Sequence, residues 1–427
     1  MRVLALLLAL FLTSFDSDLR VLAQDRQDKP QPTVIAFRGA KVYLGTGAPI
    51  ENATIVVSNG KIVDVGKEVA VPPDAKVVDV AGKVVIPGLI DAASRLFLPP
   101  GERSAGSAEH HALDAIDLYQ GDYREAVGQG VTTVYVGPPS QGTINGLGAV
   151  LHLDAARTVV LRDAALKLTL GASGGDTSTA LERYQSYPQL KQAFDGARQY
   201  AETWEKYRKD HAEYEQKKQS KDKKEKDEAK EPAKPKVDPR NEILARALDP
   251  KQTLKVRIEV HTADAILLAL RLSDEFKLRA VLEHATEGAA VAAEIAKAKT
   301  PVVAGPVFRL GGYTVDYLNH SVATPAALVK AGVPVAIGSF GDERAGQWGP
   351  GATRFLAESA AFAASRGLTR EQALATITAD AARILGIDKT HGSLEKGKAA
   401  DLVVLSGEPF DPATRVEQTI IDGEAAR

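Results

Sequence analysis

Short apolar runs separated by turn residues occupy both ends of the chain. Between residues 33 and 80 these runs are rich in Val and Ile, and Asn59-Gly60 between two of them is the strongest hairpin signal in the sequence. The tail carries similar runs after residue 400. Two β-rich segments at opposite ends of the sequence predict one composite β-sandwich, assembled from residues 33–86 and 388–427.

The long middle of the chain, residues 87–387, alternates between strand-like and helix-like patterns. A strand pattern at 256–261 is followed by an amphipathic helical pattern at 263–276 and a second strand pattern at 279–284. Thr369 has the position of an N-cap for a helix that runs to residue 385. This alternation is typical of parallel sheets whose strands are joined by helices, so we predict a (β/α)8 TIM-like barrel of α/β class.

One stretch, residues 200–240, interrupts this alternation. It begins with aromatic residues at helical spacing and becomes a dense run of Lys, Glu and Asp that ends in prolines. Mixed charge at this density cannot bury a core, so the pattern predicts a solvated helix that fades into disorder. The composition favours an inserted solvated loop, with a protein-docking arm as the alternative.

The first 23 residues have the pattern of a cleaved signal peptide. Arg2 precedes an apolar run at residues 3–12 that is too short to span a bilayer, and small residues precede a cleavage position after Ala23. We therefore expect a periplasmic or secreted protein, with a buried N-terminal helix as the alternative. No later run is apolar over the roughly 18 residues that a membrane span requires.

Composition narrows the chemistry further. The 427-residue chain has 44% hydrophobic residues, which is enough for one large domain and a smaller one. A net charge of −2 gives no general attraction to nucleic acid or to an anionic membrane. The chain has no cysteine, which excludes disulfides and thiolate metal sites.

Four phrases carry a resemblance to a known family, and they are Pro87-Gly88-Leu89-Ile90-Asp91, Gly130-Val131-Thr132-Thr133-Val134, Glu283-His284-Ala285-Thr286-Glu287-Gly288 and Gly392-Ser393-Leu394-Glu395-Lys396-Gly397. In this order they resemble the amidohydrolase superfamily, and its imidazolonepropionase-like members in particular. The resemblance covers nearly all of the chain after the predicted signal peptide. It implies the same barrel and composite domain, and hydrolysis of a non-peptide C–N bond by metal-activated hydroxide.

The family's metal ligands are only partly present. The resemblance implies His-x-His on the first barrel strand and an aspartate on the eighth, and this chain has Ala93, Arg95 and Phe340 at those positions. Ala93 and Phe340 cannot bind a metal, and Arg95 places a permanent positive charge where the cation would lie. Arg95 and Phe340, together with Glu259, are therefore expected to line a pocket and to contact substrate.

The remaining polar candidates come from the fifth, sixth and eighth strands. His284 matches the sixth-strand histidine, and Glu259-Val260-His261 covers the fifth-strand ligand with an alignment that leaves Glu259 or His261 at the ligand position. Asp342 lies two residues beyond the lost aspartate. The resemblance then implies His284 and Asp342 as catalytic residues and His261 and His284 as ligands of one zinc, iron or manganese ion. Histidines retained without a metal, hydrogen-bonded locally, are the alternative, and the missing ligands favour no metal at all.

Three weaker candidates remain. His110-His111 would form an alternative metal site or a solvated loop. Lys167 matches a lysine common in the subgroup, but a carboxylated bridging lysine would need two metals, so a structural role is favoured. Glu259 and Glu283 would have to face each other to support a sugar-cleaving barrel, and strand alternation turns Glu283 away from His284.

Two functional hypotheses follow. In the first, the chain is an amidohydrolase that cleaves a small amide or cyclic amide with a reduced metal site. In the second, it is a pseudoenzyme that keeps the barrel as a binding or assembly subunit, as a homo-oligomer or paired with an active relative. A small-molecule ligand fits either hypothesis. The residues alone favour the second because three expected ligands are replaced.

Overall fold

The computed structural model describes residues 34–98, 106–119, 123–140, 142–171, 180–220, 222–227, 229–307, 317–341 and 350–426. The predicted signal peptide and Asp342 lie outside these residues. Across the part that is described, no helix is both long enough and apolar enough to cross a membrane.

Eight strands form the barrel sheet, and they are β6 (Leu89–Ser94), β7 (Val131–Val136), β8 (Ile144–His152), β9 (Val159–Thr169), β10 (Lys255–Val260), β11 (Ala280–His284), β12 (Val302–Ala304) and β13 (Val335–Ile337). They lie side by side in sequence order from β6 to β13. The two edges meet where Phe340 N donates to Ala93 O at 2.7 Å. The predicted TIM-like barrel is therefore confirmed.

One barrel strand departs from the predicted alternation. β8 runs antiparallel to both β7 and β9, and turns rather than helices connect these three strands. A turn can reverse the chain only into an antiparallel neighbour, whereas a parallel neighbour requires a longer crossover. The sequence pattern gave no strand between residues 137 and 170, so β8 and β9 were missed.

Helices cover the outer face of the barrel, and they are α3 (Tyr123–Gly128), α7 (Ala263–Phe276), α8 (Ala292–Ala298), α9 (Thr324–Lys330), α10 (Leu356–Ala364) and α11 (Arg370–Thr376). α12 (Ala379–Leu385) instead packs against the interior core of the barrel. Short 3-10 turns lie at η1 (Ala112–Asp114), η2 (Gly288–Val291) and η4 (Pro350–Phe355). Thr369 caps α11 in a capping box with Gln372, as predicted. The prediction of one helix from 369 to 385 was wrong, because the chain breaks at Ile377-Thr378 and starts α12 afresh.

The two faces of the barrel strands have different chemistry. Leu282, Val302 and Val335 belong to the core between the strands and the outer helices. Val281 and Val303, one position away in each strand, belong to the interior core. This alternation with period two decides which polar residues reach the interior of the barrel.

A second sheet combines the two ends of the sequence, and its strands are β1 (Val34–Val42), β2 (Ile50–Ser58), β3 (Lys61–Gly66), β4 (Lys76–Asp79), β5 (Val84–Pro87), β14 (Leu402–Leu405), β15 (Val416–Ile421) and β16 (Glu424–Ala425). β5 pairs with β1 on one side and with β14 on the other, so it joins the N-terminal strands to the C-terminal ones. The predicted hairpin at Asn59-Gly60 is confirmed by the pairing of Ser58 with Lys61.

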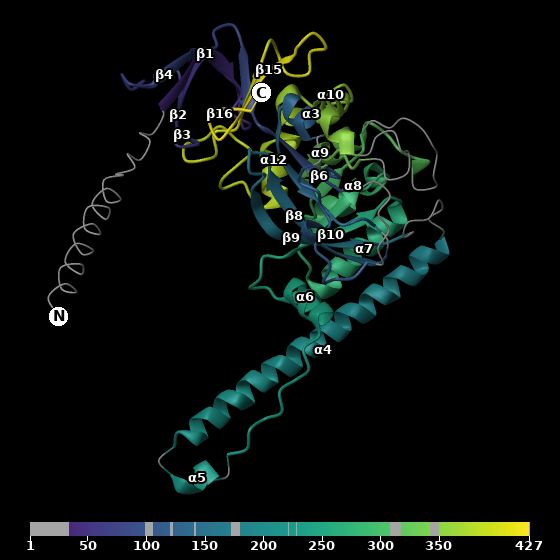
Figure 1. Cartoon of the computed structure of the whole chain (residues 1–427). Helices are drawn as coiled ribbons and strands as arrows, with labels where there is room; N and C mark the ends of the chain where they lie inside the picture. Colours follow the sequence, from purple (N-terminus) through teal and green to yellow (C-terminus); the bar gives the residue numbers. More distant parts are fainter. Residues whose placement is uncertain are drawn as a thin grey trace, which may run out of the picture.

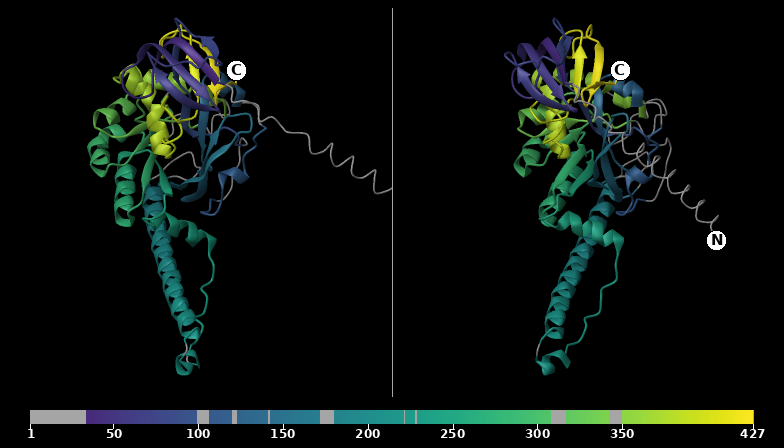
Figure 2. Two further views of the ribbon diagram at one scale, coloured as in Figure 1. Left: turned by 90° about the vertical axis from the view of Figure 1, so that its left-hand side faces the viewer. Right: turned by 60° about the vertical axis from the view of Figure 1, so that its left-hand side comes forward.

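The insertion forms a helical arm, made of α4 (Ala180–Lys218), α5 (Lys223–Asp227) and α6 (Pro239–Leu248). The arm projects away from the barrel at the end opposite the terminal sheet (Figures 1 and 2). At its base, buried Leu190 and Phe194 of α4 pack with Leu244 of α6 in the outer core of the barrel. The helix is longer than predicted because it starts about twenty residues earlier, and this earlier part buries Leu190, Phe194 and Ala197.

The return segment of the arm, residues 229–238, is extended where the sequence predicted disorder. Pro232 and Pro235 are half-buried while the residues between them are exposed, which is the period of three of a polyproline II helix. On α4, Tyr200, Trp204 and Tyr207 are also half-buried and their rings contact one another in turn. This aromatic stripe gives the return segment an apolar face to lie against.

Candidate active site

Three potential metal ligands meet where β10 and β11 end. Glu259, His261 and His284 each offer one ligand atom, and these atoms all lie within 4.8 Å of one another. The imidazole rings of His261 and His284 stack with centroids 4.5 Å apart. All three lie at the carboxyl ends of parallel strands, which is the face where TIM-barrel enzymes carry their active sites.

Alternation explains two of the three positions, and backbone strain explains the third. Glu259 and His261 are separated by one residue and point to the same side of β10. Alternation alone would turn His284 outward with Leu282, but His284 has a φ of 64° and Ala285 a φ of 45°. These left-handed conformations cost roughly 1–3 kcal/mol each for such residues and are concentrated at functional sites. Here they return the imidazole of His284 to the mouth of the barrel.

Hydrogen bonds orient both histidines. His284 Nδ1 donates to the carbonyl oxygen of Gly305 at 2.7 Å, which leaves Nε2 with a free lone pair. His261 Nδ1 lies 2.8 Å from Thr286 Oγ1. Metal-bound histidines characteristically use their second nitrogen in this way, because the bond fixes the tautomer and the direction of the ring.

Aromatic side chains enclose the histidines. The ring of Phe340 stacks on His284 with centroids 3.9 Å apart, and Tyr317 contacts His261 edge-on at 4.8 Å. Phe340 has a φ of 57°, so the end of β13 is strained in the same way as the end of β11. These rings exclude water from one side of the cluster and provide an apolar wall for a ligand.

Beneath the histidines, the barrel interior contains four ionised side chains. Lys167 Nζ lies 3.1 Å from Glu259 and 3.4 Å from Glu283, and the Arg257 guanidinium donates to Glu283. Arg257 also donates to the carbonyl oxygen of Ala92 at 2.8 Å. The four side chains come from the interior faces of β9, β10 and β11 and carry no net charge together. Buried charges persist only with this kind of pairing.

These charges determine the ionisation of the cluster. Burial alone would raise the pKa of the Glu259 carboxyl, but the Lys167 ammonium group holds it well below its usual range. Burial also opposes ionisation of Glu283, and Arg257 and Lys167 still lower its pKa. Burial lowers the pKa of His284 to about 3, so its imidazole is neutral at pH 7. Neutral imidazole and ionised carboxylate are the forms that bind a metal.

The donor set fits one divalent cation. Two imidazole nitrogens and a carboxylate oxygen are the ligands of many catalytic zinc sites, and such sites keep a further position for water. Glu259 Oε2 already contacts Lys167 Nζ and accepts from Ser140 Oγ, which leaves Oε1 for a metal. The residues present therefore fit a single ion, and Lys167 is the group that competes with it for Glu259.

The other predicted site residues are scattered. Arg95 lies just beyond β6, two residues after Ala93, which takes part in closing the barrel. Among the described residues, neither His110 nor His111 belongs to a group of possible metal ligands. The Nδ1 atom of His111 instead lies 3.3 Å from Oδ1 of Asp163. Asp342 falls outside the described residues.

Sequence reasoning missed Arg257, Thr286 and Tyr317. Arg257 was predictable in principle, because it alternates with Glu259 in a strand where Val256, Ile258 and Val260 are apolar, so both had to face the barrel interior. Thr286 follows the sixth-strand histidine within the family phrase. Tyr317 had no such signal, because a loop brings it to the histidines.

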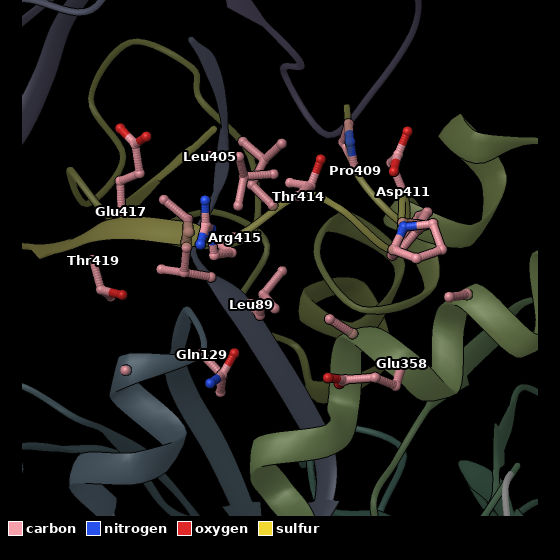
Figure 3. A pocket seen from close by; sticks show the side chains of 18 of the residues that line it. Leu89, Gln129, Glu358, Leu405, Pro409, Asp411, Thr414, Arg415, Glu417 and Thr419 are labelled. Atoms are coloured by element: carbon pink, nitrogen blue, oxygen red, sulfur yellow. The ribbon is translucent and has the colours of Figure 1, made fainter. Parts of the chain in front are cut away.

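A groove of about 790 Å³ lies at the opposite end of the barrel. It is lined by Leu89, which begins β6, by Gln129, which precedes β7, and by residues of α10, β14 and β15 (Figure 3). Its charged side chains are Glu358, Asp411, Arg415 and Glu417. The groove contains none of the histidines, so we assign the candidate active site from the cluster at the mouth.

Comparison of the sequence with known proteins finds one family model and several similar enzymes. A model of the amidohydrolase family matches residues 257–426, which include most of β10, all of β11 and all three potential ligands. An imidazolonepropionase from Symbiobacterium thermophilum is 27% identical over 381 residues, covering 84% of this chain and 85% of the relative. An imidazolonepropionase from Pseudomonas savastanoi pv. phaseolicola is 38% identical over 123 residues, which span 29% of this chain and only 28% of the relative.

The architecture also matches a solved structure. An amidohydrolase from Thermotoga maritima superposes with a TM-score of 0.78 and 29% sequence identity, covering 92% of this chain and 99% of that one. The similarity therefore includes the barrel and the terminal sheet together.

Proposed function

Since the chain belongs to the amidohydrolase superfamily, we propose that it is a hydrolase of non-peptide C–N bonds that uses one divalent metal ion. Glu259, His261 and His284 would hold this ion at the barrel mouth. The substrate class is a small amide or cyclic amide, as the names of the imidazolonepropionase relatives suggest.

One observation carries the proposal: the three ligand atoms converge within 4.8 Å although the first-strand histidines are missing. The orientation of both rings supports it, because Gly305 O and Thr286 Oγ1 hold the Nδ1 atoms and so fix the directions of the two rings. Residues kept only by ancestry would not need strained backbone at both His284 and Phe340. The sequence alone favoured a protein without metal, and this geometry favours one ion.

Each residue has a defined task in this mechanism. A bound divalent ion would supply a Lewis acid and lower the pKa of its water to about 7. His284 would bind as a neutral imidazole whose Nδ1 proton stays on its bond to the Gly305 carbonyl oxygen, and Thr286 would keep the ring of His261 in place. Lys167 keeps Glu259 ionised by lying 3.1 Å from it. Tyr317 and Phe340 give the substrate an apolar surface and exclude bulk water on that side.

A second candidate function rests on the position of Lys167. Its ammonium group already satisfies Glu259 and Glu283, so the cluster is electrically complete without a metal. The chain would then be a non-catalytic barrel, acting as a binding or assembly subunit. We also propose that the chain is exported, because its first 23 residues have the composition of a signal peptide.

Metal analysis distinguishes these two functions. The purified chain, expressed with and without added zinc, manganese and iron, is analysed by elemental mass spectrometry alongside His261→Ala, His284→Ala and His211→Ala. His211 lies on the arm and serves as the matched control. We expect the first two variants to lose one equivalent of metal and the control to lose none. Equal metal content in all four folded proteins would contradict the hydrolase site.

A further inference from the structure

A second group of histidine and carboxylate side chains lies where the barrel meets the terminal sheet. His152 ends β8, Asp401 immediately precedes β14, and Asp422 lies in the turn between β15 and β16. Asp154 follows two residues after His152. We call these four residues the seam. Its described side chains have no role in the chemistry at the barrel mouth.

Asp401 fixes the tautomer of His152. His152 Nε2 lies 3.0 and 2.9 Å from the two carboxylate oxygens of Asp401, so its proton is shared between them. Both residues are buried, with 4% and 6% of their surface exposed. A histidine whose Nε2 donates to a carboxylate presents the lone pair of Nδ1 on its other side, as in carboxylate–histidine–metal triads.

The Nδ1 atom of His152 faces a second carboxylate. His152 Nδ1 lies 3.5 Å from Asp422 Oδ2, which is longer than a normal N–H···O bond. Two ligands of a tetrahedral zinc ion at about 2.1 Å are separated by roughly 3.4 Å, so this spacing matches a pair of metal ligands. Asp154 contributes a third ligand atom, and the three atoms lie within 4.8 Å of one another.

Local structure holds the third ligand in place. The two carboxylate oxygens of Asp154 accept from Thr158 N at 2.8 Å and from Thr158 Oγ1 at 2.7 Å. A carboxylate held by two local bonds loses little conformational freedom when it binds a cation. The side chain of Asp422 is 46% exposed, so an ion can enter the seam from solvent.

The seam also carries an excess of negative charge, which favours binding of a cation. Among the described residues, no Lys or Arg lies within ion-pair distance of Asp154, Asp401 or Asp422. Lys398 is near, but its ammonium group pairs with Glu395 at 2.9 Å. Three carboxylates therefore surround one imidazole, and a divalent ion would neutralise most of this excess.

From this geometry we propose that His152, Asp154 and Asp422 form a second divalent-cation site, zinc being the best match, with Asp401 orienting His152. The bound ion would tie β8 of the barrel to the β15–β16 turn of the terminal sheet. His391 and Asp401 form another group with His152, but there the Nε2 atom is already occupied by its bond to Asp401. The competing explanation is a protonated His152 that satisfies both carboxylates without a metal.

Calorimetry on the full chain separates these explanations. The double variant His261→Ala/His284→Ala removes the ligands at the barrel mouth, and after chelation it is titrated with zinc alone. We expect one equivalent to bind and to raise the melting temperature. Adding His152→Gln, which keeps the donor to Asp401 but lacks the Nδ1 lone pair, or Asp422→Asn should weaken binding at least tenfold. Glu424→Gln, two residues away with the same charge change, should leave it unaltered.

A folded double variant that binds no zinc would overturn the proposal and leave the protonated histidine. Equal weakening by Asp422→Asn and Glu424→Gln would also overturn it, because general charge rather than ligation would then be responsible. If the double variant does not fold, the same comparison is made in the otherwise unaltered chain by metal content. There, Asp422→Asn should lose one equivalent and Glu424→Gln none. This result does not depend on the proposed hydrolase activity.

Discussion

The barrel mouth and the seam are built from the same residue types with opposite electrostatics. At the mouth, Glu259 and Glu283 each lie beside a buried cation, Lys167 or Arg257. At the seam, Asp401 and Asp422 face His152 with no lysine or arginine pair among the described residues. A histidine and a carboxylate in contact therefore predict little until the nearby cations are counted.

The difference reverses the direction of the histidine pKa. At the mouth, burial and the neighbouring His261 lower the pKa of His284 to about 3. At the seam, burial again lowers the pKa of His152, but the hydrogen bond to Asp401 and the charges of Asp401, Asp422 and Asp154 outweigh it and raise the pKa. Carboxylates that lack a lysine or arginine partner, rather than burial, therefore determine whether the pKa of the histidine rises or falls.

The largest expected effect comes from removing a cation at the mouth. Arg257→Met leaves Glu283 buried without its main partner, and breaking one side of a buried ion pair costs roughly 3–5 kcal/mol. Urea unfolding at pH 7 measures the loss. The exposed Lys277, which pairs with Asp274 at 2.7 Å, provides the control Lys277→Met, which we expect to change stability by less than about 1 kcal/mol. Similar losses of unfolding free energy in both variants would show that the buried cation at the mouth stabilises the protein no more than an exposed one does.

The next effect is an acid-sensitive stability that originates at the mouth. The unfolded chain protonates His284 near pH 6.5, whereas the folded protein does so only near pH 3. The folded state thus binds fewer protons between these values, and stability falls as the pH falls below 6.5. At pH 5 this amounts to about 2 kcal/mol. Unfolding of chelated protein from pH 5 to 7 should show this slope, His284→Asn should reduce it, and His211→Asn should not.

A smaller effect should follow from misorienting the other mouth histidine. Thr286→Val is close to isosteric but removes the partner of His261 Nδ1, so the ring loses its fixed direction. Loss of an outer-shell partner weakens metal binding by about 10-fold to 100-fold, and the neutral hydroxyl suggests the lower end. Competition with a chelating dye measures the affinity. Unchanged affinity would show that His261 does not bind the ion.

The sequence predicted the barrel because its signals are local. Strand and helix periods can be counted within ten or twenty residues, and the hairpin at Asn59-Gly60 depends on two residues alone. The exceptions were β8 and β9, because β8 is buried at every position and carries no alternation, and no helix separates the two strands from each other or from β7. The resemblance, rather than periodicity, indicated Glu259, His261 and His284.

The seam was beyond sequence reasoning because its contacts are not local. His152 and Asp401 are 249 residues apart, and they meet only because β8 and β14 are brought together by two different sheets. The strain at His284 was equally hidden, since alternation predicts the opposite direction for its side chain. The resemblance therefore located the ligands of the mouth but not the ion pairs and hydrogen bonds that determine their ionisation.

The smallest expected effect tests the seam by its pH dependence. In chelated protein the raised pKa of His152 means that the folded state holds its proton to a higher pH than the unfolded state. The contribution to stability is then complete below about pH 6.5 and disappears as the pH rises through the folded-state value, opposite to the mouth. We expect this effect to be smaller than the acid-sensitive effect of His284, because burial of His152 opposes the rise in pKa that the carboxylates cause. His152→Gln should abolish the decline between pH 6.5 and 9, whereas His284→Asn should preserve it. A chelated protein whose stability does not change over this range would mean that His152 is not protonated in the folded state, and the contrast between mouth and seam would then rest on geometry alone.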